Sequence, residues 1–373
     1  MSKISEKLNV INDAKNNIKI AIETDGIEVG NVGIQEYVDK INIINTNIAN
    51  AYTEIENKGV IPTGTKNSKN LASSISSIQT GGTGGGDEEI ATSFISTIDN
   101  TLGANVTKLP EGITSIGNMA FNGRTNLALT SLPNGITAIG NSSFNGCSKL
   151  ALTRLPDTVK TIGTNAFYNC TNLALEKLPE DLQTVGSMAF YYCANVKFTT
   201  LPSKMTKMPS FSYATGLKNF EVPEGVTSAE TNALANCLNL ETLKIPSTLK
   251  TISENFCNNC KKLHTVEIAE GVTKIDVRAF FTCTVLRSLV IPSTITNIET
   301  QAFASSTSLK AIICKGTTPP KLSTNVFNNV NGYYVYVPDE SVDAYKAATN
   351  WASIASAIKP ISELPDEFKE LLW

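Results

Sequence analysis

A closely spaced group of two cysteines and a histidine is the feature of this chain that suggests a metal site. Cys257, Cys260 and His264 follow one another closely, and a Cys-x-x-Cys pair with a nearby histidine is a spacing that zinc sites use. No second pair lies nearby, and His264 is the only histidine among the 373 residues. Since a structural zinc site needs four ligands, we predict that the chain binds no metal ion and no cofactor.

Serine is abundant, but serine nucleophiles usually need a histidine base that a carboxylate orients. His264 has no acidic residue at a spacing that suggests such a triad. The segment TGGTGGG (80 to 86) lacks the lysine of a phosphate-binding loop. A glycosidase-type pair of carboxylates remains an open alternative, because the distance between two carboxylates cannot be read from sequence. We predict that the protein is not an enzyme and has no catalytic residues.

Charge and hydropathy exclude several classes of partner. The net charge of −3 offers no basic surface for nucleic acid. The first residues, MSKISEKLNVINDAKNN, carry charges where a signal peptide has an apolar core. No segment approaches the roughly 18 apolar residues of a membrane span. We therefore expect synthesis in the cytoplasm without a signal peptide, no membrane insertion and no nucleic-acid partner.

The main feature of the sequence is an internal repeat of 23 residues. Prolines recur at this period, with one shorter unit of 21 residues and with Ala269 at one missing position: Pro110, Pro133, Pro156, Pro179, Pro202, Pro223, Pro246 and Pro292. Alternating apolar residues before each proline predict one short strand per unit. Proline cannot donate a hydrogen bond to a sheet, so we expect it where the strand ends. The stretch SKMTKMPSFSYATGL after Pro202 departs from the pattern and predicts a local irregularity.

Each unit follows L-P-x-x-[IVL]-x-x-I-G-x-x-A-F-x-x-C-x-x-L, as in LPDTVKTIGTNAFYNCTNL (155 to 173). Its phenylalanine is predicted to point into a core that stacked units share. The cysteine three residues later recurs at Cys147, Cys170, Cys193, Cys237, Cys260 and Cys283. Copies of one position have parallel Cβ vectors, which disfavour a disulfide. We interpret these cysteines as small buried apolar residues.

These motifs resemble the BspA-type (Treponema-type) leucine-rich repeat family over roughly residues 105 to 361. The resemblance implies an α/β repeat solenoid of about nine 23-residue units, with a parallel β ladder and short helical turns. We assign the repeats to residues 89–316. Residues 317–373, with TTPP (317 to 320) and GYYVYVPDESVDAYKAATNW (332 to 351), resemble the C-terminal cap of that family.

Residues 1–79 lack the proline repeat and contain two copies of about 33 residues, in which positions 17 to 44 match positions 51 to 78. Apolar residues at three- and four-residue spacing in each copy predict a helix, a glycine turn and a second short helix. We therefore predict a small α-helical domain over residues 1–79. This segment resembles tail and fibre proteins of phages that infect Gram-positive bacteria. Two such copies have a thin core, so we expect a homo-oligomer, with a trimer favoured, or docking to a baseplate or tail protein. Residues 80–88 form a Gly-rich linker.

Two surfaces are candidate binding sites. The residue two before each proline should project from the sheet into solvent; we call this set the sheet-face column, and it comprises Arg154, Lys177, Thr200, Glu221, Lys244 and Glu267. Its varied chemistry is typical of a ligand-binding surface and equally of a solvated sheet. A second candidate is the aromatic patch of Tyr168, Tyr191 and Tyr192, since tyrosines anchor proteins and stack on sugars. Half-buried packing is the alternative for these rings.

We therefore predict a receptor-binding or tail-fibre protein of a phage or phage-tail-like particle, present in the virion. Its solenoid would bind a bacterial surface protein or glycan, and several copies per particle would add avidity. The alternative is a non-virion adhesin or protein-interaction scaffold at the bacterial cell surface, exported by an unrecognised route.

Overall fold

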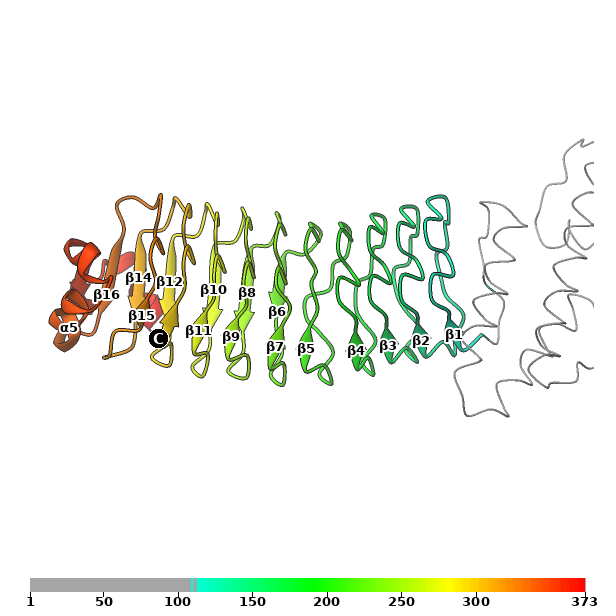
Figure 1. Ribbon diagram of the computed structural model, residues 1–373, viewed down its shortest axis with the longest axis horizontal. Helices are drawn as coiled ribbons and strands as arrows, with labels where there is room; N and C mark the ends of the chain where they lie inside the picture. Colours follow the sequence, from blue (N-terminus) through cyan, green and yellow to red (C-terminus); the bar gives the residue numbers. More distant parts are fainter. Residues whose placement is uncertain (1–108, 110–112, 373) are drawn as a thin grey trace, which may run out of the picture. The chain divides into compact units, whose positions relative to one another are not determined.

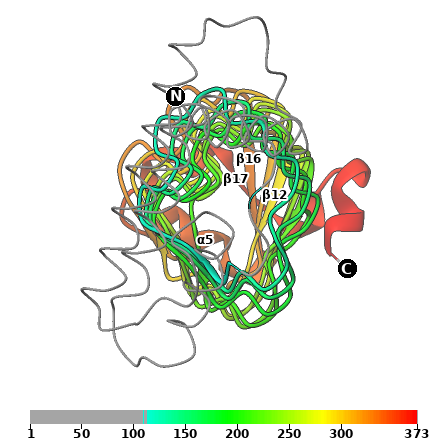
Figure 2. The same ribbon diagram turned by 90° about the vertical axis from the view of Figure 1, so that its right-hand side faces the viewer.

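The computed structural model describes Leu109 and residues 113 to 372. The predictions for residues 1–79 and for the linker 80–88 lie outside these residues. The described chain forms a solenoid in which each turn lies beside the next (Figure 1). Seen along its axis, the turns superimpose as a ring (Figure 2). The leucine-rich repeat solenoid expected from the sequence is confirmed.

One side of the solenoid carries a two-residue strand in each turn, placed after the repeat position of the proline. Ten such strands lie in the described chain: β1 (Ser115–Ile116), β2 (Ala138–Ile139), β3 (Thr161–Ile162), β4 (Thr184–Val185), β5 (Lys207–Met208), β7 (Ser228–Ala229), β9 (Thr251–Ile252), β11 (Lys274–Ile275), β13 (Asn297–Ile298) and β15 (Lys321–Leu322). They pair in parallel within three sheets, β1 to β4, β5 with β7, and β9 to β15. The sequence prediction had missed this ladder. It also counted nine units, because the tenth lies within 317–373.

The strands predicted before the proline occur only from Asn219 onward in the described chain: β6 (Asn219–Glu221), β8 (Thr242–Ile245), β10 (Thr265–Ile268), β12 (Ser288–Ile291), β14 (Ala311–Cys314), β16 (Tyr334–Val337) and β17 (Ile358–Pro360). In β8, buried Leu243 and Ile245 alternate with more exposed residues. In an earlier turn the buried residues are Leu173, Leu175 and Leu178. The three-residue step in that series breaks the alternation that a strand requires, so the prediction is wrong for the earlier turns.

Stacked phenylalanines fill the interior. The ring centroids of Phe121, Phe144, Phe167 and Phe190 follow one another at 5.2, 5.4 and 5.5 Å, with the ring planes within 12°. Phe327 stacks on Phe303 at 5.7 Å and extends the same core into the tenth turn. The corners that carry these rings are hydrogen-bonded turns, and the short helical turns that the sequence predicted there do not form.

All eight cysteines are buried, as the sequence predicted for the six at the repeat position, and none of them is paired in a disulfide. The thiol of Cys170 donates a hydrogen bond of 3.0 Å to the carbonyl of Phe144, and Cys147 and Cys193 make the same bond in their turns. Ser306 occupies this position in a later turn and donates to Phe280 O at 2.8 Å. Each of these thiols thus adds a second hydrogen bond to a carbonyl that already accepts a backbone N–H, in addition to filling space.

The C-terminal cap comprises η1 (Asp339–Ser341), α5 (Val342–Ala347), η2 (Ala352–Ala357), η3 (Ile361–Glu363) and η4 (Asp366–Leu372). Trp351 is fully buried and donates from Nε1 to Pro320 O at 2.7 Å, which closes the end of the core. Segment η4 lies outside the ring (Figure 2), where Leu364 and Phe368 pack on Ile313 and Tyr336. No helix within residues 113 to 372 is long and apolar enough to span a bilayer.

Candidate binding surfaces

The structure places all six residues of the sheet-face column on the surface. Strand pairing aligns Glu221 with Lys244 and Lys244 with Glu267, and a single bridge adds Thr200. The ammonium of Lys244 lies 3.4 Å from the carboxylate of Glu267, and both side chains are more than half exposed. Exposed pairs of this kind contribute little free energy. The column is therefore a solvated row of partly paired charges.

The column has a defined end. In the following sheet, made of β12, β14, β16 and β17, the equivalent residues are apolar: Val290 pairs with Ile313, and Ile313 pairs with Tyr336. The C-terminal segment covers these apolar residues, and Arg287 holds it with a 3.1 Å ion pair to Glu367. The open sheet face therefore ends at about Val290.

The 21-residue unit lacks two residues at one corner. Five positions separate Ile162 from the core residue Phe167, whereas only three separate Met208 from Phe211. In regular turns the core phenylalanine donates its N–H to the next turn, as Phe167 does to Ala189 O at 2.9 Å. The described residues show no such bond from Phe190 to its shortened neighbour. This is the local irregularity expected after Pro202.

A largely buried carboxylate accepts hydrogen bonds at this shortened corner. Glu230 accepts a hydrogen bond of 3.2 Å from the N–H of Ser210 and one of 2.9 Å from the ammonium of Lys207. Its side chain is only 10% exposed. The shortened corner is therefore an ordered feature of the solenoid.

Four tyrosines gather beside this corner; we call Tyr168, Tyr191, Tyr192 and Tyr213 the tyrosine cluster. Tyr168 stacks on Tyr191 with centroids 5.4 Å apart, and Tyr192 stacks on Tyr213 at 4.1 Å. The two pairs meet edge to face, with 4.8 Å between Tyr191 and Tyr192. A hydrogen bond with Tyr192 raises the pKa of Tyr213, while burial raises the pKa of Tyr191. The three predicted tyrosines therefore form one contiguous block.

Sequence reasoning missed Tyr213. It lies two residues after Phe211, as Tyr192 lies two residues after Phe190, so aligning the short unit on its phenylalanine would have found it.

The backbone under Tyr192 and Tyr213 is unusual for tyrosine. The position two residues after the core residue is left-handed in every described turn, and its occupants are Gly123, Gly146, Asn169, Tyr192, Tyr213, Asn236, Asn259, Thr282, Ser305 and Asn329. Glycine and asparagine tolerate this conformation, whereas other residues lose about 1 kcal/mol or more. Two neighbouring tyrosines therefore hold a strained backbone, and such strain concentrates at functional sites.

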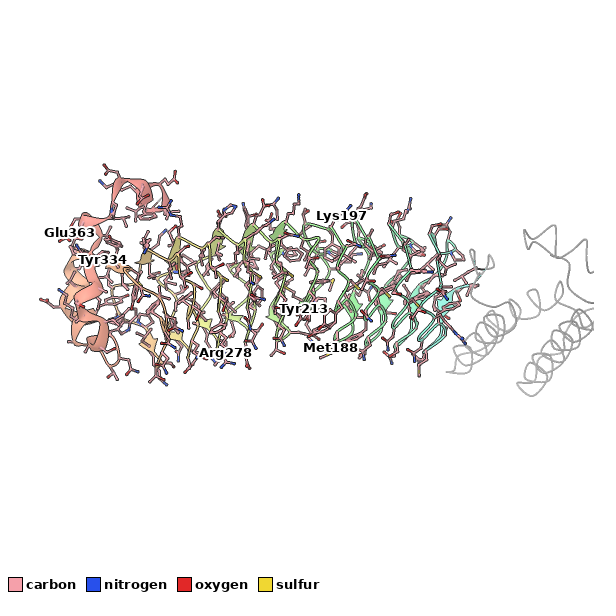
Figure 3. The ribbon with its side chains drawn as sticks, turned by 90° about the horizontal axis from the view of Figure 1, so that it is seen from above. Met188, Lys197, Tyr213, Arg278, Tyr334 and Glu363 are labelled. Atoms are coloured by element: carbon pink, nitrogen blue, oxygen red, sulfur yellow. The ribbon has the colours of Figure 1, made fainter. Side chains whose placement is uncertain are left out.

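Apart from the Lys207–Glu230 ion pair at the shortened corner, the corner residues around the cluster carry no charge. Met188, 46% exposed, lies at another left-handed position, with a φ of 55°. Figure 3 shows Met188 near Tyr213 on one side of the solenoid and Lys197 on the opposite side. The neighbouring corner residues are Asn145, Asn165, Asn169, Ser187 and Ser212. The cluster is thus a neutral aromatic surface, partly open to solvent.

The potential metal ligands do not converge. Cys257 and Cys260 are buried in the core, whereas His264 is exposed and its Nδ1 lies 3.0 Å from the hydroxyl of Thr265. Among the residues that the structure describes, no three His, Cys, Asp or Glu side chains could hold a metal ion together.

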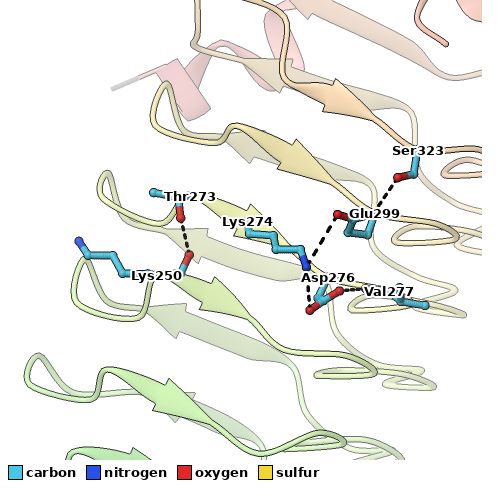
Figure 4. Close-up of polar contacts among 7 residues, drawn as sticks. All are labelled: Lys250, Thr273, Lys274, Asp276, Val277, Glu299 and Ser323. Atoms are coloured by element: carbon cyan, nitrogen blue, oxygen red, sulfur yellow. Dashed lines mark hydrogen bonds and ion pairs between the residues drawn. The ribbon is translucent and has the colours of Figure 1, made fainter. Parts of the chain in front are cut away.

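Acidic residues do collect along one corner of the later turns (Figure 4). Lys274 pairs with Asp276 at 3.2 Å and with Glu299 at 3.8 Å. The hydroxyl of Ser323 also donates to Glu299, at 2.8 Å. These contacts tie neighbouring turns together, and both carboxylates have partners within the solenoid.

Comparison with known proteins identifies the repeats. A family model described as BspA type leucine rich repeat region matches residues 99–215 and 207–310. This match begins after residues 1–79, so the resemblance of that segment to phage tail proteins stays a prediction. No curated protein matches the chain.

Solved structures with related repeats come from several bacteria. A leucine rich cell surface protein of Faecalibacterium prausnitzii is 26% identical over 56% of this chain and 60% of that chain, with a TM-score of 0.37. The T. pallidum leucine rich repeat protein is 25% identical over 50% and 79% of the two chains, with a TM-score of 0.35. A leucine-rich repeat protein of Bacteroides ovatus is 21% identical over 68% and 83%, with a TM-score of 0.30.

Proposed function

Because the chain belongs to the BspA-type leucine-rich repeat family, we propose that it is a non-enzymatic adhesin located at the bacterial cell surface. In this proposal the solenoid binds a component of a cell surface, and the tyrosine cluster is the main contact. Residues 1–79 would attach or oligomerise the protein. The tail-fibre hypothesis depends on that segment, which lies outside the described residues, so the adhesin is the function that we propose.

The tyrosine cluster carries this proposal. Stacked tyrosines are rigid, present both apolar rings and hydroxyl groups, and lose little side-chain entropy on binding. Tyr192 and Tyr213 stand where other turns mostly use asparagine or glycine, at a backbone cost of about 1 kcal/mol each. Packing within the solenoid does not require this choice, since Asn236 and Asn259 serve in the next turns. Contact with a binding partner explains why tyrosines occupy these two positions.

Binding of the labelled full-length chain to intact low-GC Gram-positive cells tests the proposal. We expect some strains to be decorated and others not. The double variant Tyr192→Asn/Tyr213→Asn should lower the affinity at least tenfold, since one tenfold step is about 1.4 kcal/mol.

A matched variant separates the two candidate surfaces. Lys244→Ala/Glu267→Ala removes one ion pair from the sheet-face column without changing the net charge. It should bind cells like the unmodified chain. Failure to bind any strain would argue against an adhesin, and a loss confined to Lys244→Ala/Glu267→Ala would move the site to the sheet face.

A further inference from the structure

Two corner positions without side chains lie near the tyrosine cluster; with their neighbours Asn122, Asn145, Tyr168, Asn169 and Tyr192 we call them the shelf. Its floor consists of Gly123 and Gly146, which have no side chains. A Cβ atom built on Gly123 would meet nothing within 4 Å, and one on Gly146 would meet only backbone atoms of Gly123, at 3.7 Å or more. Among the described residues, no side chain outside the adjoining chain positions comes within 4 Å of a Cβ at either glycine.

Amides flank the shelf and aromatic rings end it. Asn122 and Asn145 hold the preceding position in the two glycine turns, and the side chain of Asn169 ends the glycine row between Gly146 and Tyr192. The next residues in these two rows are Tyr168 and Tyr192, whose centroids lie 6.2 Å apart with the planes at 74°. With roughly 4.8 Å between turns, the three steps from Gly123 to Tyr192 span about 14 Å. This is enough for a short chain of sugar rings.

The chemistry of the shelf matches a neutral carbohydrate. An asparagine amide donates and accepts hydrogen bonds, as a sugar hydroxyl does, so the two pair in either direction. Tyrosine rings offer apolar surface to the C–H groups of a sugar, and their hydroxyls add polar contacts. None of the seven shelf residues, Asn122, Gly123, Asn145, Gly146, Tyr168, Asn169 and Tyr192, carries a charge.

We propose that this shelf and the tyrosines at its end bind a neutral oligosaccharide of a surface glycan. The inference rests on the adhesin function and names the class of its ligand. A protein partner is the competing occupant, but protein interfaces favour aromatic and arginine anchors that fill pockets of the partner. Here the aromatic rings instead adjoin asparagine amides and two glycines without side chains.

Three asparagine substitutions at the same left-handed position test the site. Gly146→Asn fills the floor, and Tyr192→Asn removes part of the aromatic end. Thr282→Asn makes an equivalent change far along the solenoid, where φ is 60°. Asparagine already occupies this position at Asn169, Asn236, Asn259 and Asn329, so all three variants should fold, which thermal unfolding would verify.

Affinity electrophoresis of the full-length chain through gels that contain soluble neutral glucan, mannan or galactan provides the measurement, with polygalacturonate as the charged control. We expect at least one neutral polysaccharide to retard the chain. Gly146→Asn and Tyr192→Asn should weaken this retardation at least tenfold, and Thr282→Asn should not change it. The inference is overturned if no neutral polysaccharide retards the chain or if all three variants behave alike.

Cell binding distinguishes this inference from the proposed adhesin. If protease treatment of the cells abolishes binding while periodate oxidation of their glycans does not, the chain is an adhesin for a protein and the glycan inference is wrong. If neutral polysaccharide retards the chain in a shelf-dependent way but no cell is bound, the glycan site stands and the adhesin proposal fails.

Discussion

The turns before residue 205 and the turns after residue 219 share a 23-residue period, but different contacts join each turn to the next. In the turns before residue 205, the glycines Gly140, Gly163 and Gly186 follow the short strands. The side chain of Asn141 accepts a hydrogen bond of 2.8 Å from the N–H of Thr164, so one asparagine joins two turns. In the turns after residue 219, Glu230, Ser253, Asp276 and Glu299 replace those glycines. Longer strands and ion pairs join these later turns.

This difference shows that the 23-residue period determines which residues fill the core, whereas the contacts between neighbouring turns can differ from one region to the other. Close backbone approach in the first region excludes side chains from one corner row and leaves a neutral surface. Charged side chains in the second region take over the contacts between turns. The shortened unit lies where one scheme gives way to the other, and the tyrosine cluster lies beside it.

Among substitutions at these contacts between turns, we expect the largest loss of stability at the glycines that follow the short strands, Gly140, Gly163 and Gly186. A Cβ on Gly163 would lie 2.5 Å from Asn141 N and 2.6 Å from Gly140 C, both backbone atoms. Gly163→Ala should therefore destabilise the protein by about 1–3 kcal/mol. Ser253→Ala, at the equivalent position of the second region, loses only the 2.7 Å bond to Glu230 O and should cost about 1 kcal/mol. Urea unfolding of both variants checks the comparison, which equal losses would contradict.

A smaller effect is expected at the cysteine position, which both regions share. Cys170→Val would remove one of the two hydrogen bonds that the buried carbonyl of Phe144 accepts, while the N–H of Cys147 still donates to it, and should cost about 0.5–1.5 kcal/mol. Cys170→Ser keeps a donor, as Ser306 does in the second region. Thermal unfolding should rank the serine variant above the valine variant. The reverse order would mean that apolar packing outweighs the hydrogen bond.

The smallest effect concerns acid stability in the second region. Hydrogen bonds from the backbone and side chain of Ser247 lower the pKa of Glu224. Its stabilising contribution is therefore complete above the unfolded glutamate pKa of about 4.3 and is lost as the pH falls through the lower folded value. Glu224→Gln should unfold at a lower urea concentration than the unmodified chain at pH 7, and the difference between the two midpoints should be smaller at pH 3. A constant difference at both pH values would rule out this titration as the cause.

Much of the core followed from the sequence, because the 23-residue period repeats often enough to align its phenylalanines and cysteines. The ten two-residue strands that follow the proline position escaped prediction, since two residues show no alternation and their partners lie in other turns. The sheet-face column was located by its distance from the proline. Its apolar end at Val290 was not, because the covering residues Leu364 and Phe368 come from the far end of the chain.

The tyrosines were found only in part for a similar reason. Tyr168, Tyr191 and Tyr192 follow regular phenylalanines, whereas the shortened unit shifted Tyr213 out of the consensus. The left-handed backbone beneath Tyr192 and Tyr213 is a three-dimensional property that residue types alone did not show.

The most direct test of the account measures folding and cell binding of one variant, Tyr192→Asn. Asparagine relieves about 1 kcal/mol of left-handed strain, while loss of the stacked ring removes about 0.5–1.5 kcal/mol. The account therefore predicts unfolding free energy within about 1 kcal/mol of the unmodified chain, together with at least a tenfold loss of binding. A stability loss of several kcal/mol with unchanged binding would contradict it, because the cluster would then serve the fold alone.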